Sequence, residues 1–503
     1  MGGNPSMHGS GKSDGPVVPA KPSNNAAEAV AEAVEGRGPA KGNTTRQTRP
    51  GRRAGTGVSS ELDRVRQLAR ADRDVRFTAL LHHVTVDRLR DAYRAISPGA
   101  AAGVDGVTWR EYGLDLEDNL QDLHARVLRG AYRARPTRRA YIPKPDGRLR
   151  PLGVAALEDK ILQRAVVEVL NAVYEQDFLG FSYGFRPGRS PHDALDALAV
   201  GIERRRVRWV LDADIRDFFS RLDQGWLEKF LEHRIADRRV LRLIQKWLRA
   251  GVIENGKWTK TEEGTAQGAS VSPLLANVYL HYVFDLWADQ WRRQGARGDM
   301  ILVRFADDWL AGFERHGDAA RFLADLHQRL AKFGLELHPD KTRLIEFGRF
   351  AARNRARRGI RVRPETFEFL GFTHQCATDR HGRFKLRRVT SKKRMRAKLK
   401  AVKTELRRRR HHPIPEQGRW LASVLRGHYH YYGVPDNTNA LQAFRDQVQR
   451  HWHHALRRRS QRSAVTLERM HRIATRWLPR ARVHHPWPNT RFDARTQGRS
   501  PVR

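Results

Sequence analysis

Cysteine is almost absent from the sequence: Cys376 is the single one in 503 residues. One cysteine cannot form a disulfide framework or a cysteine-based zinc site within a chain, which favours a reducing compartment. Runs of about 18 or more apolar residues are also missing, so a membrane-spanning helix is not expected. Residues 1–21 lack the apolar segment of a secretory signal, so we expect a cytoplasmic protein.

Acidic residues are scarce compared with basic ones. The 95 lysines and arginines exceed the 55 aspartates and glutamates, which gives a formal net charge of +40. An excess of this size is typical of proteins that bind nucleic acid. An anionic membrane is the other partner that such charge attracts, but without a spanning segment we expect nucleic-acid partners and no membrane. The length allows roughly three or four domains.

Two adjacent aspartates, Asp307 and Asp308, lie between apolar runs at residues 300–303 and 309–311. This pattern predicts a β-hairpin with the two acids at its turn. Neighbouring carboxylates on a tight turn suit Mg²⁺, which is typically bound by one or two carboxylates together with substrate phosphates. A solvated Asp-Asp turn is the alternative, and for the dipeptide alone it is the commoner case.

A second acidic site, Asp212 and Asp214, lies inside the apolar stretch 209–219. In a strand the two carboxylates share one face. An acid in such a strand is costly to bury unless it is paired or bound to metal. Asp214 is far from Asp307 in sequence, so the two acidic sites can form one metal site only by meeting in space.

Cationic and aromatic residues gather at two further places. Pro-Asp-Gly at residues 145–147 predicts a hairpin turn, which puts Lys144 and Arg150 on adjacent strands. There they can clamp an anion such as a triphosphate, or they are ordinary solvated charges. Residues 178–190 combine aromatic rings with Arg186 and Arg189, a mixture against which single strands and base pairs pack.

Periodicity predicts the other elements near these motifs. Helices are expected over 157–174, 192–202 and 319–333, and from Ser272 as N-cap, with Pro273 at the first position, to about residue 291. Residues 334–342 read as a strand and turn that end near Lys341, and 367–372 as a short aromatic strand containing Gly371. From residue 385 the composition shifts to helices rich in lysine and arginine, which favours a surface that faces a polyanion.

In this order, the motifs resemble those of the reverse transcriptases encoded by bacterial group II introns, over about residues 60–479. Phe305-Ala-Asp-Asp308 is similar to the polymerase Tyr-Ala-Asp-Asp box, and the segment from Asp212 to Phe219 is similar to the first palm motif. The resemblance implies an α+β right-hand polymerase, with fingers, a palm built on a small antiparallel sheet flanked by helices, and a helical thumb with a maturase domain. It also implies the bacterial cytoplasm or nucleoid.

The resemblance implies roles for single residues. Asp214, Asp307 and Asp308 would be the catalytic carboxylates that hold two Mg²⁺ ions, with Mn²⁺ as a substitute. Lys341 would donate a proton to the leaving pyrophosphate, and Phe219 would exclude a ribose 2′-OH. The residues expected to bind the incoming dNTP are Lys144, Arg150, Phe219 and Gln267. The residues expected to contact nucleic acid are Arg186, Arg189, Gly371, Arg426, Tyr429 and Tyr431.

The implied function is RNA-directed DNA synthesis, with binding of intron RNA to assist splicing and intron mobility by target-primed reverse transcription. The partners would be an RNA template, intron RNA, a DNA primer or target, and dNTPs. Two alternatives remain open: a domesticated or defence reverse transcriptase without an intron partner, and a non-catalytic RNA-binding splicing factor. Gene neighbourhood separates the first alternative, because an intron's catalytic RNA should flank or contain the reading frame, and a primer-extension assay with an RNA template separates the second. The most informative single experiment is sequencing the RNA that co-purifies with the protein.

Many relatives end in a zinc-bound endonuclease with cysteine and histidine ligands, which a chain with Cys376 alone is not expected to carry. Mobility would then need target DNA that is already open or nicked.

The expected organisation has five parts. The parts are a disordered basic arm (1–58), an N-terminal helical extension (59–135), fingers and palm (136–384), a helical thumb and maturase domain (385–479), and a basic, poorly ordered tail (480–503).

Overall fold

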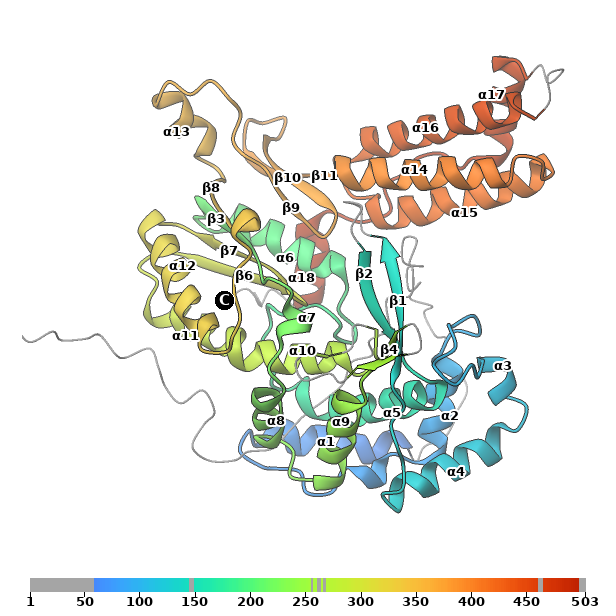
Figure 1. The fold of residues 1–503 in the computed structure, drawn as a ribbon. Helices are drawn as coiled ribbons and strands as arrows, with labels where there is room; N and C mark the ends of the chain where they lie inside the picture. The colour runs from blue at the N-terminus through green and yellow to red at the C-terminus, as the bar shows by residue number, and fades with distance from the viewer. Residues whose placement is uncertain are drawn as a thin grey trace, which may run out of the picture.

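The computed structural model describes residues 58–143, 149–254, 257–259, 264–265, 268–459 and 465–496. Within these residues the chain forms two four-stranded sheets, one three-stranded sheet and the helices that cover them. Figure 1 shows the N-terminal helices at the bottom, a central sheet on the left, and a bundle of long helices projecting at the upper right. The arm expected at residues 1–58 lies outside the described residues, except for the start of the first helix at Val58.

The N-terminal helices share their core with the rest of the molecule. Leu62, Leu89 and Leu120 are at most 3% exposed and belong to the same apolar cluster as the long helix that follows the first hairpin. The extension expected at 59–135 is helical, and its core is continuous with the next part of the chain. The elements are α1 (Val58–Ala71), α2 (Val86–Ala95), α3 (Trp109–Tyr112), α4 (Leu116–Leu128) and α5 (Leu157–Tyr174), the last with the bounds predicted from periodicity.

The first sheet contains the predicted Pro-Asp-Gly hairpin. Its two long strands are antiparallel, and Ile142 lies opposite Arg150; the turn itself lies outside the described residues. A later strand joins the sheet in parallel beside the first. The order is β2 (Leu149–Val154), β1 (Thr137–Pro143), β4 (Val252–Glu254) and β5 (Lys257–Thr259).

The central sheet is antiparallel throughout and holds both acidic motifs. Its order is β6 (Met300–Phe305), β7 (Asp308–Phe313), β3 (Trp209–Asp214) and β8 (Arg343–Glu346). Successive residues of a strand face opposite sides, so Leu211 packs in the core with α10 to α12 while Val210 packs in the core with α6. The helices are α6 (Pro191–Arg204), α10 (Ser272–Leu280), α11 (Leu286–Gln294) and α12 (His316–Ala331).

Two local expectations need correction. Val271, not Ser272, holds the N-cap position of α10, and Pro273 lies in its first turn. Residues 334–338 do not form a strand: they contribute one isolated bridge, from Leu337 to Ile215, before the 3₁₀ turn Pro339–Lys341. Pro339 lacks an N–H group and cannot donate to a sheet ladder, which ends the extended segment there.

The aromatic segment at 367–372 is a hairpin rather than one strand. The chain turns at Leu370 and Gly371, which both have positive φ, between β9 (Phe367–Phe369) and β10 (Phe372–Thr378). β11 (Phe384–Thr390) pairs with β10. The basic helical region therefore begins after this strand and not at residue 385. Leu386, Arg388 and Thr390 are buried in alternation, and this period of two is lost in a composition dominated by charge.

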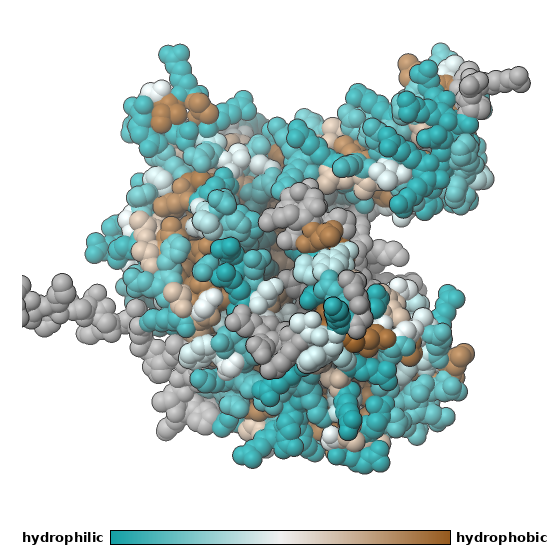
Figure 2. All heavy atoms as spheres, in the orientation of Figure 1, coloured by the Kyte–Doolittle hydropathy of each residue, from teal (hydrophilic) through white to brown (hydrophobic). Residues whose placement is uncertain are grey.

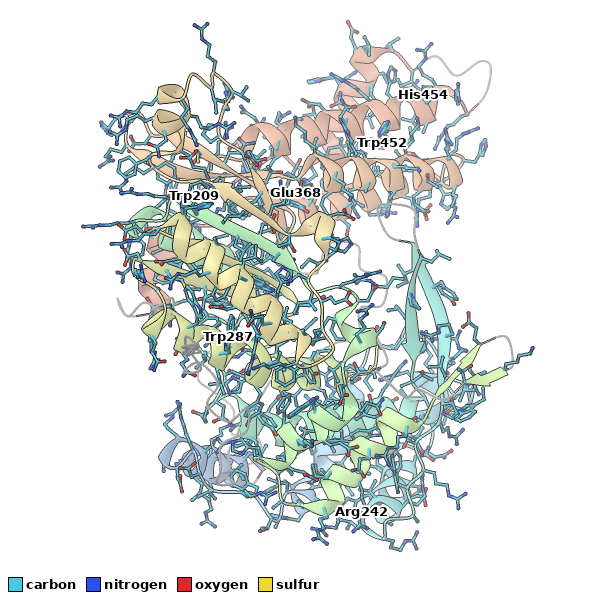
Figure 3. All side chains as sticks on the ribbon, turned by 60° about the vertical axis from the view of Figure 1, so that its left-hand side comes forward. Trp209, Arg242, Trp287, Glu368, Trp452 and His454 are labelled. Atoms are coloured by element: carbon cyan, nitrogen blue, oxygen red, sulfur yellow. The ribbon has the colours of Figure 1, made fainter. Side chains whose placement is uncertain are left out.

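The bundle of long helices has its own core. Trp452, labelled in Figure 3, is fully buried and donates from Nε1 to Oε1 of Gln417 at 2.7 Å. The outer side of the bundle that Figure 2 shows is almost entirely hydrophilic. The bundle consists of α14 (Lys392–Arg408), α15 (Ile414–Tyr432), α16 (Thr438–Arg457) and α17 (Leu467–Trp477).

The C-terminal segment is ordered where disorder was expected. Residues 488–496 form α18 (Pro488–Thr496), which packs against α6. Phe492 is 6% exposed in the core beneath it. Arg491 pairs with Asp196 at 2.5 Å and Arg495 with Asp193 at 2.6 Å. A segment with few apolar residues can pack here because its arginines form ion pairs with buried acids of α6. Those acids are distant in sequence, so the local composition of the segment does not reveal the pairing.

Candidate catalytic site

Three aspartates meet at one end of the central sheet. Asp214 is the last residue of β3 and lies directly opposite Asp308, the first residue of β7. Asp307 precedes Asp308 in the turn between β6 and β7. Directly opposite residues of an antiparallel pair have Cβ atoms about 4.5–5.5 Å apart. The fold thus brings together the two acidic motifs that the sequence holds far apart.

The carboxylates repel one another. Desolvation, together with the charges of Asp307, Asp214 and Asp212, raises the pKa of Asp308 to about 7. Desolvation and the charge of Asp214 raise the pKa of Asp307 as well. The apo site therefore holds excess negative charge that a cation would neutralise.

Two cationic side chains already occupy neighbouring acids. Lys341 Nζ forms an ion pair with Oδ2 of Asp214, and Arg343 Nη2 lies 2.9 Å from Oδ2 of Asp212. As the side chains are placed, no three acidic, histidine or cysteine side chains in the described part of the chain are grouped to hold a metal ion. The donors at this strand end are all carboxylate oxygens, the ligand type of Mg²⁺.

A buried arginine holds the catalytic turn from below. Arg304 is fully buried, and its guanidinium contacts Asp285 at 2.5 and 2.7 Å. The same group donates to Oδ1 of Asn277 at 3.0 Å and to the carbonyl of Ala306, within the turn, at 2.9 Å. Every residue of this network is fixed by α10, by the helical turn after it, or by β6, so the position of the turn depends on the core.

Two backbone features complete this support. The helix from α10 to α11 contains one π turn at His281–Asp285, where Asp285 is fully buried; such turns are rare and frequent at functional sites. Ala306 has φ +58°, and Gly184 lies against it. A Cβ at Gly184 would be 2.1 Å from the nitrogen of Ala306, so only glycine fits beneath the turn.

Sequence reasoning missed this supporting network. From the sequence alone, no role is assigned to Arg304, Asp285 or Gly184. One signal was present: a buried strand that contains an arginine needs a buried acid elsewhere. Nothing in the sequence indicates which acid that is, because the pairing depends on where the π turn His281–Asp285 lies relative to β6.

The residues expected near the nucleotide are partly in place. Arg150 is exposed on β2, and its charge acts on Asp307. The carbonyl of Phe219 accepts from the amide of Thr265 at 2.9 Å, and a Cβ at Gly264 would lie 2.5 Å from that oxygen. The backbone at Phe219 is therefore held close to a loop, while Lys144 and Gln267 lie outside the described residues.

Arg186 and Arg189 do not face nucleic acid, contrary to expectation. Arg186 is 4% exposed; it pairs with Glu175 and donates to the carbonyls of Leu179 and Ser182. Arg189 donates to the carbonyls of Gly180 and Ser182, and its guanidinium lies 5.3 Å from the ring of Tyr183. Both side chains hold the loop between α5 and α6, so the mixture of aromatic and arginine residues here is structural.

The expected nucleic-acid contacts of the C-terminal region divide in the same way. Tyr429 is 2% exposed in the core of the helix bundle and donates to the carbonyl of Pro479 at 3.3 Å, so it is not available to a ligand. Tyr431 is half-buried and donates to the carbonyl of Leu370, at the turn that contains Gly371. Arg426 is exposed on α15. Gly371 and Arg426 therefore stay candidates for contact with nucleic acid.

Arg394, which was not singled out, is the bundle residue with a direct electrostatic effect on the site. It lies in the first turn of α14, is exposed, and its positive charge opposes the rise in the pKa of Asp308. Sequence reasoning placed it within a basic run whose members were treated alike. Its special position arises because β11 delivers the start of α14 next to the catalytic turn.

An antiparallel sheet that gathers three carboxylates at one end, with helices on both faces and a helical bundle beside it, defines the palm and thumb of a right-hand polymerase. Residues 142–374 match the family model "Reverse transcriptase (RNA-dependent DNA polymerase)". Protein YkfC of Escherichia coli K12 is 36% identical over 274 residues, which cover 50% of this chain and 71% of that protein. The chain therefore belongs to the reverse transcriptase family.

The similarity extends to intron-encoded proteins. Group II intron-encoded protein LtrA of Lactococcus lactis is 34% identical over 222 residues, covering 44% of this chain and 37% of LtrA. A putative COX1/OXI3 intron 1 protein of Saccharomyces cerevisiae is 29% identical over 314 residues, covering 51% of this chain and 36% of that protein. These matches confirm the resemblance to intron-encoded reverse transcriptases, while the chain spans little more than a third of each of these two intron proteins.

No helix among the described residues is both long and apolar enough to cross a membrane.

The buried ion pair generates a stability prediction. Arg304→Met leaves Asp285 buried without a counter-charge, and we expect it to lower the free energy of unfolding by about 3–5 kcal/mol. The double variant Arg304→Met/Asp285→Leu removes both charges and should recover most of that loss. Urea denaturation measures both variants, with Arg242→Met, at an exposed site, as the control. An equal loss in the single and double variants would contradict the assignment.

The raised pKa of Asp308 generates a pH prediction. Its folded-state pKa of about 7 exceeds the ordinary value of 3.8, so the carboxyl is protonated in both states at low pH and costs nothing. Between pH 3.8 and about 7 the unfolded protein ionises this carboxyl while the folded protein keeps it protonated, so the folded state loses stability across this range, and above 7 the loss is complete. Asp308→Asn should therefore raise the melting temperature of the metal-free protein more at pH 8 than at pH 5. The side chain is partly exposed, so we expect about 1 kcal/mol or less. Calorimetry in chelator measures it, and a gain independent of pH would argue against the repulsion.

Proposed function

We propose that this protein is an RNA-directed DNA polymerase that acts with a group II intron RNA, assisting its splicing and its mobility by target-primed reverse transcription. The observation that carries the proposal is the convergence of Asp214, Asp307 and Asp308 on adjacent antiparallel strands. Membership of the reverse transcriptase family and the similarity to intron-encoded proteins support the choice of reaction and partner.

Asp214, Asp307 and Asp308 would hold two Mg²⁺ ions, with Mn²⁺ as a substitute. When bound, such ions neutralise the phosphates and lower the pKa of a primer 3′-OH. Protein groups contribute mainly position and charge to phosphoryl transfer. Arg304 holds the backbone of the Asp307–Asp308 turn in place by donating a hydrogen bond to the Ala306 carbonyl. The two carboxylates would therefore need no backbone rearrangement to bind metal ions.

Lys341 has two successive roles in this proposal. In the metal-free state it neutralises Asp214, which lowers the cost of keeping three carboxylates together. Beside Asp214, which would be among the residues that hold the metal ions, the Lys341 ammonium would be placed to donate a proton to leaving pyrophosphate. Arg150 balances Asp307 and, with Lys144 and Gln267, would bind the incoming dNTP, whose sugar would meet the ring of Phe219.

Nucleic-acid strands would follow the cationic side of the bundle. Arg394, whose charge acts on Asp308, is suited to a primer phosphate. The turn at Gly371 is fixed by Tyr431, and a Cβ there would be 2.9 Å from the hydroxyl of Tyr432, so this turn would support the primer strand. Exposed arginines of α15, Arg426 among them, would contact intron RNA by its phosphates. Sequencing RNA that co-purifies with the protein tests the intron partner.

The catalytic assignment is tested with Asp307→Asn/Asp308→Asn. We expect dNTP incorporation on an RNA template to fall at least ~10³-fold, the scale seen when a group that stabilises transition-state charge is removed, with RNA affinity unchanged. Asp212→Asn is the matched control, since that carboxylate is engaged by Arg343, and it should retain most activity. Polymerisation surviving in the double variant would refute the metal-ligand assignment.

The role of Phe219 is tested by its truncation. Phe219→Ala removes the ring that would meet a 2′-OH, so we expect the preference for dNTPs over rNTPs to fall roughly 10- to 100-fold, the range of steric discrimination in an apolar pocket. The measurement is the ratio of kcat/KM for dCTP and CTP, with Phe219→Tyr as the conservative control. An unchanged ratio in Phe219→Ala would remove Phe219 from this role.

A further inference from the structure

The segment between β8 and β9 is unusually rich in arginine. Residues 347–366 contain one acidic residue, Glu365, and carry α13 (Ala351–Arg357), which projects away from the central sheet (Figure 1). Its seven arginines are Arg349, Arg353, Arg355, Arg357, Arg358, Arg361 and Arg363, and all except Arg355 are exposed.

Most of these arginines form no ion pair with an acidic side chain among the described residues. Arg358 pairs with Glu346, and Arg355 lies 3.6 Å from Glu365. Among the described residues, no acidic side chain forms an ion pair with Arg353, Arg357, Arg361 or Arg363. Like charges four apart on a helix destabilise it by about 0.2–0.5 kcal/mol per pair, and Arg353 and Arg357 have this spacing. The short helix would therefore gain stability from a bound polyanion.

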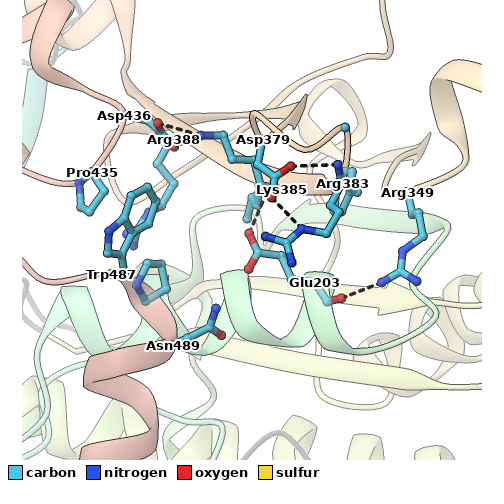
Figure 4. A pocket seen from close by; sticks show the side chains of 14 residues that line it. Glu203, Arg349, Asp379, Arg383, Lys385, Arg388, Pro435, Asp436, Trp487 and Asn489 are labelled. Carbon is cyan, nitrogen blue, oxygen red and sulfur yellow. Dashed lines mark hydrogen bonds and ion pairs between the residues drawn. The ribbon is translucent and has the colours of Figure 1, made fainter.

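The arginine stripe is fixed and leads into a cavity. Phe350 packs between two guanidinium groups, those of Arg208 at 5.1 Å and Arg353 at 4.9 Å from its ring centre. Arg353 and Arg357 lie about one turn apart on α13, and Arg349 directly precedes the N-cap residue Phe350. Arg349, at the base of this stripe, lines a cavity of about 790 Å³ (Figure 4).

The acids of the cavity are already engaged. Asp379 pairs with Arg383 at 2.8 Å, and Asp436 pairs with Lys385 at 2.8 Å. Glu203 accepts from the amide of Leu386 at 2.8 Å. Arg349 donates only to the backbone carbonyl of Glu203, at 3.1 Å, so its charge is not balanced. The cavity is therefore cationic at the side that faces α13.

An aromatic ring lies across the cavity from Arg349. Trp487 is 54% exposed, and Lys385 Nζ lies 5.7 Å from the centre of its ring. Figure 4 shows Trp487 and Arg349 on opposite sides of the cavity. An exposed indole fixed beside cationic groups is the combination on which unpaired bases stack. A surface made of arginines alone would contact only the phosphates of a nucleic acid. With Trp487 beside the arginines, this surface can also bind an unpaired base by stacking.

This surface is separate from the catalytic aspartates. Glu203 lies in the last turn of α6, just before β3 begins at Trp209 (labelled in Figure 3), whereas Asp214 ends that strand. The five steps from Trp209 to Asp214, at about 3.3 Å each, place the two ends of β3 roughly 17 Å apart. A nucleic-acid strand bound at the cavity would therefore lie away from the template nucleotide that is copied beside the aspartates.

We propose that Arg349, Arg353 and Arg357 bind consecutive phosphates of a single-stranded RNA segment, one unpaired base of which stacks on Trp487 in the cavity. The choice of RNA rests on the proposed function, which supplies an RNA partner that is not the template; the phosphate and stacking contacts do not depend on it. This segment gives the palm its own RNA contact, independent of the thumb.

The experiment uses the full chain carrying Asp307→Asn/Asp308→Asn, so that its result does not depend on polymerisation. The primer–template groove is first saturated with an RNA–DNA duplex, and binding of a fluorescent unstructured RNA is followed by anisotropy. Arg353→Gln/Arg357→Gln should weaken binding and reduce the slope of log K against log salt by about 1.4, or 0.7 for each phosphate that the variant no longer neutralises. Trp487→Ala should weaken binding roughly 5- to 150-fold, the range for one stacked base, and Trp487→Phe should restore most of it.

The matched control is Arg238→Gln/Arg242→Gln, which removes two exposed arginines of the same spacing from α9 (Arg238–Arg249), at the opposite end of the molecule (Figure 3). It should leave the affinity and the salt slope unchanged. An equal loss in this control, or no effect of Trp487→Ala, would overturn the proposal. Tighter binding of DNA than of RNA of the same sequence would overturn the assignment to RNA, and thermal unfolding of each variant verifies that it is folded.

Discussion

The buried ion pair between Arg304 and Asp285 is the interaction on which the rest of the site depends. Removing two charges from water costs several kcal/mol per ion, and only close geometry with further hydrogen bonds offsets it. Here the remaining guanidinium protons reach Asn277 and the Ala306 carbonyl. The same contacts that make the burial tolerable therefore fix the turn that carries Asp307 and Asp308. Core packing and catalytic geometry are one constraint in this fold.

At the strand end that this ion pair supports, basic side chains offset the negative charge of the carboxylates. Three carboxylates at one strand end are unfavourable without cations, as the raised pKa of Asp308 shows. Lys341 and Arg343 each neutralise one acid of β3, and Arg394 approaches from the bundle. Basic side chains thus offset part of the negative charge at this strand end, in a chain that belongs to the reverse transcriptase family.

The large positive charge serves two purposes that composition cannot separate. Arg186, Arg234, Arg304 and Arg388 are buried and paired with acids, so they are part of the core. The arginines of α13 and of the helix bundle are exposed. An arginine count therefore overstates the surface available to nucleic acid, and only burial tells the two groups apart.

The sequence by itself predicted the elements that carry the two acidic motifs and the acids that could form one site. The apolar runs on either side of Asp307 and Asp308, the apolar face of residues 157–174 and the ordered motifs each depend on neighbours in the chain, and local patterns carry that information. Tertiary structure alone decided the partners: Asp285 for Arg304, the acids of α6 for Arg491 and Arg495 of the C-terminal helix, and the core for Tyr429. Pairing between distant residues depends on how whole elements pack, and no local pattern records that packing.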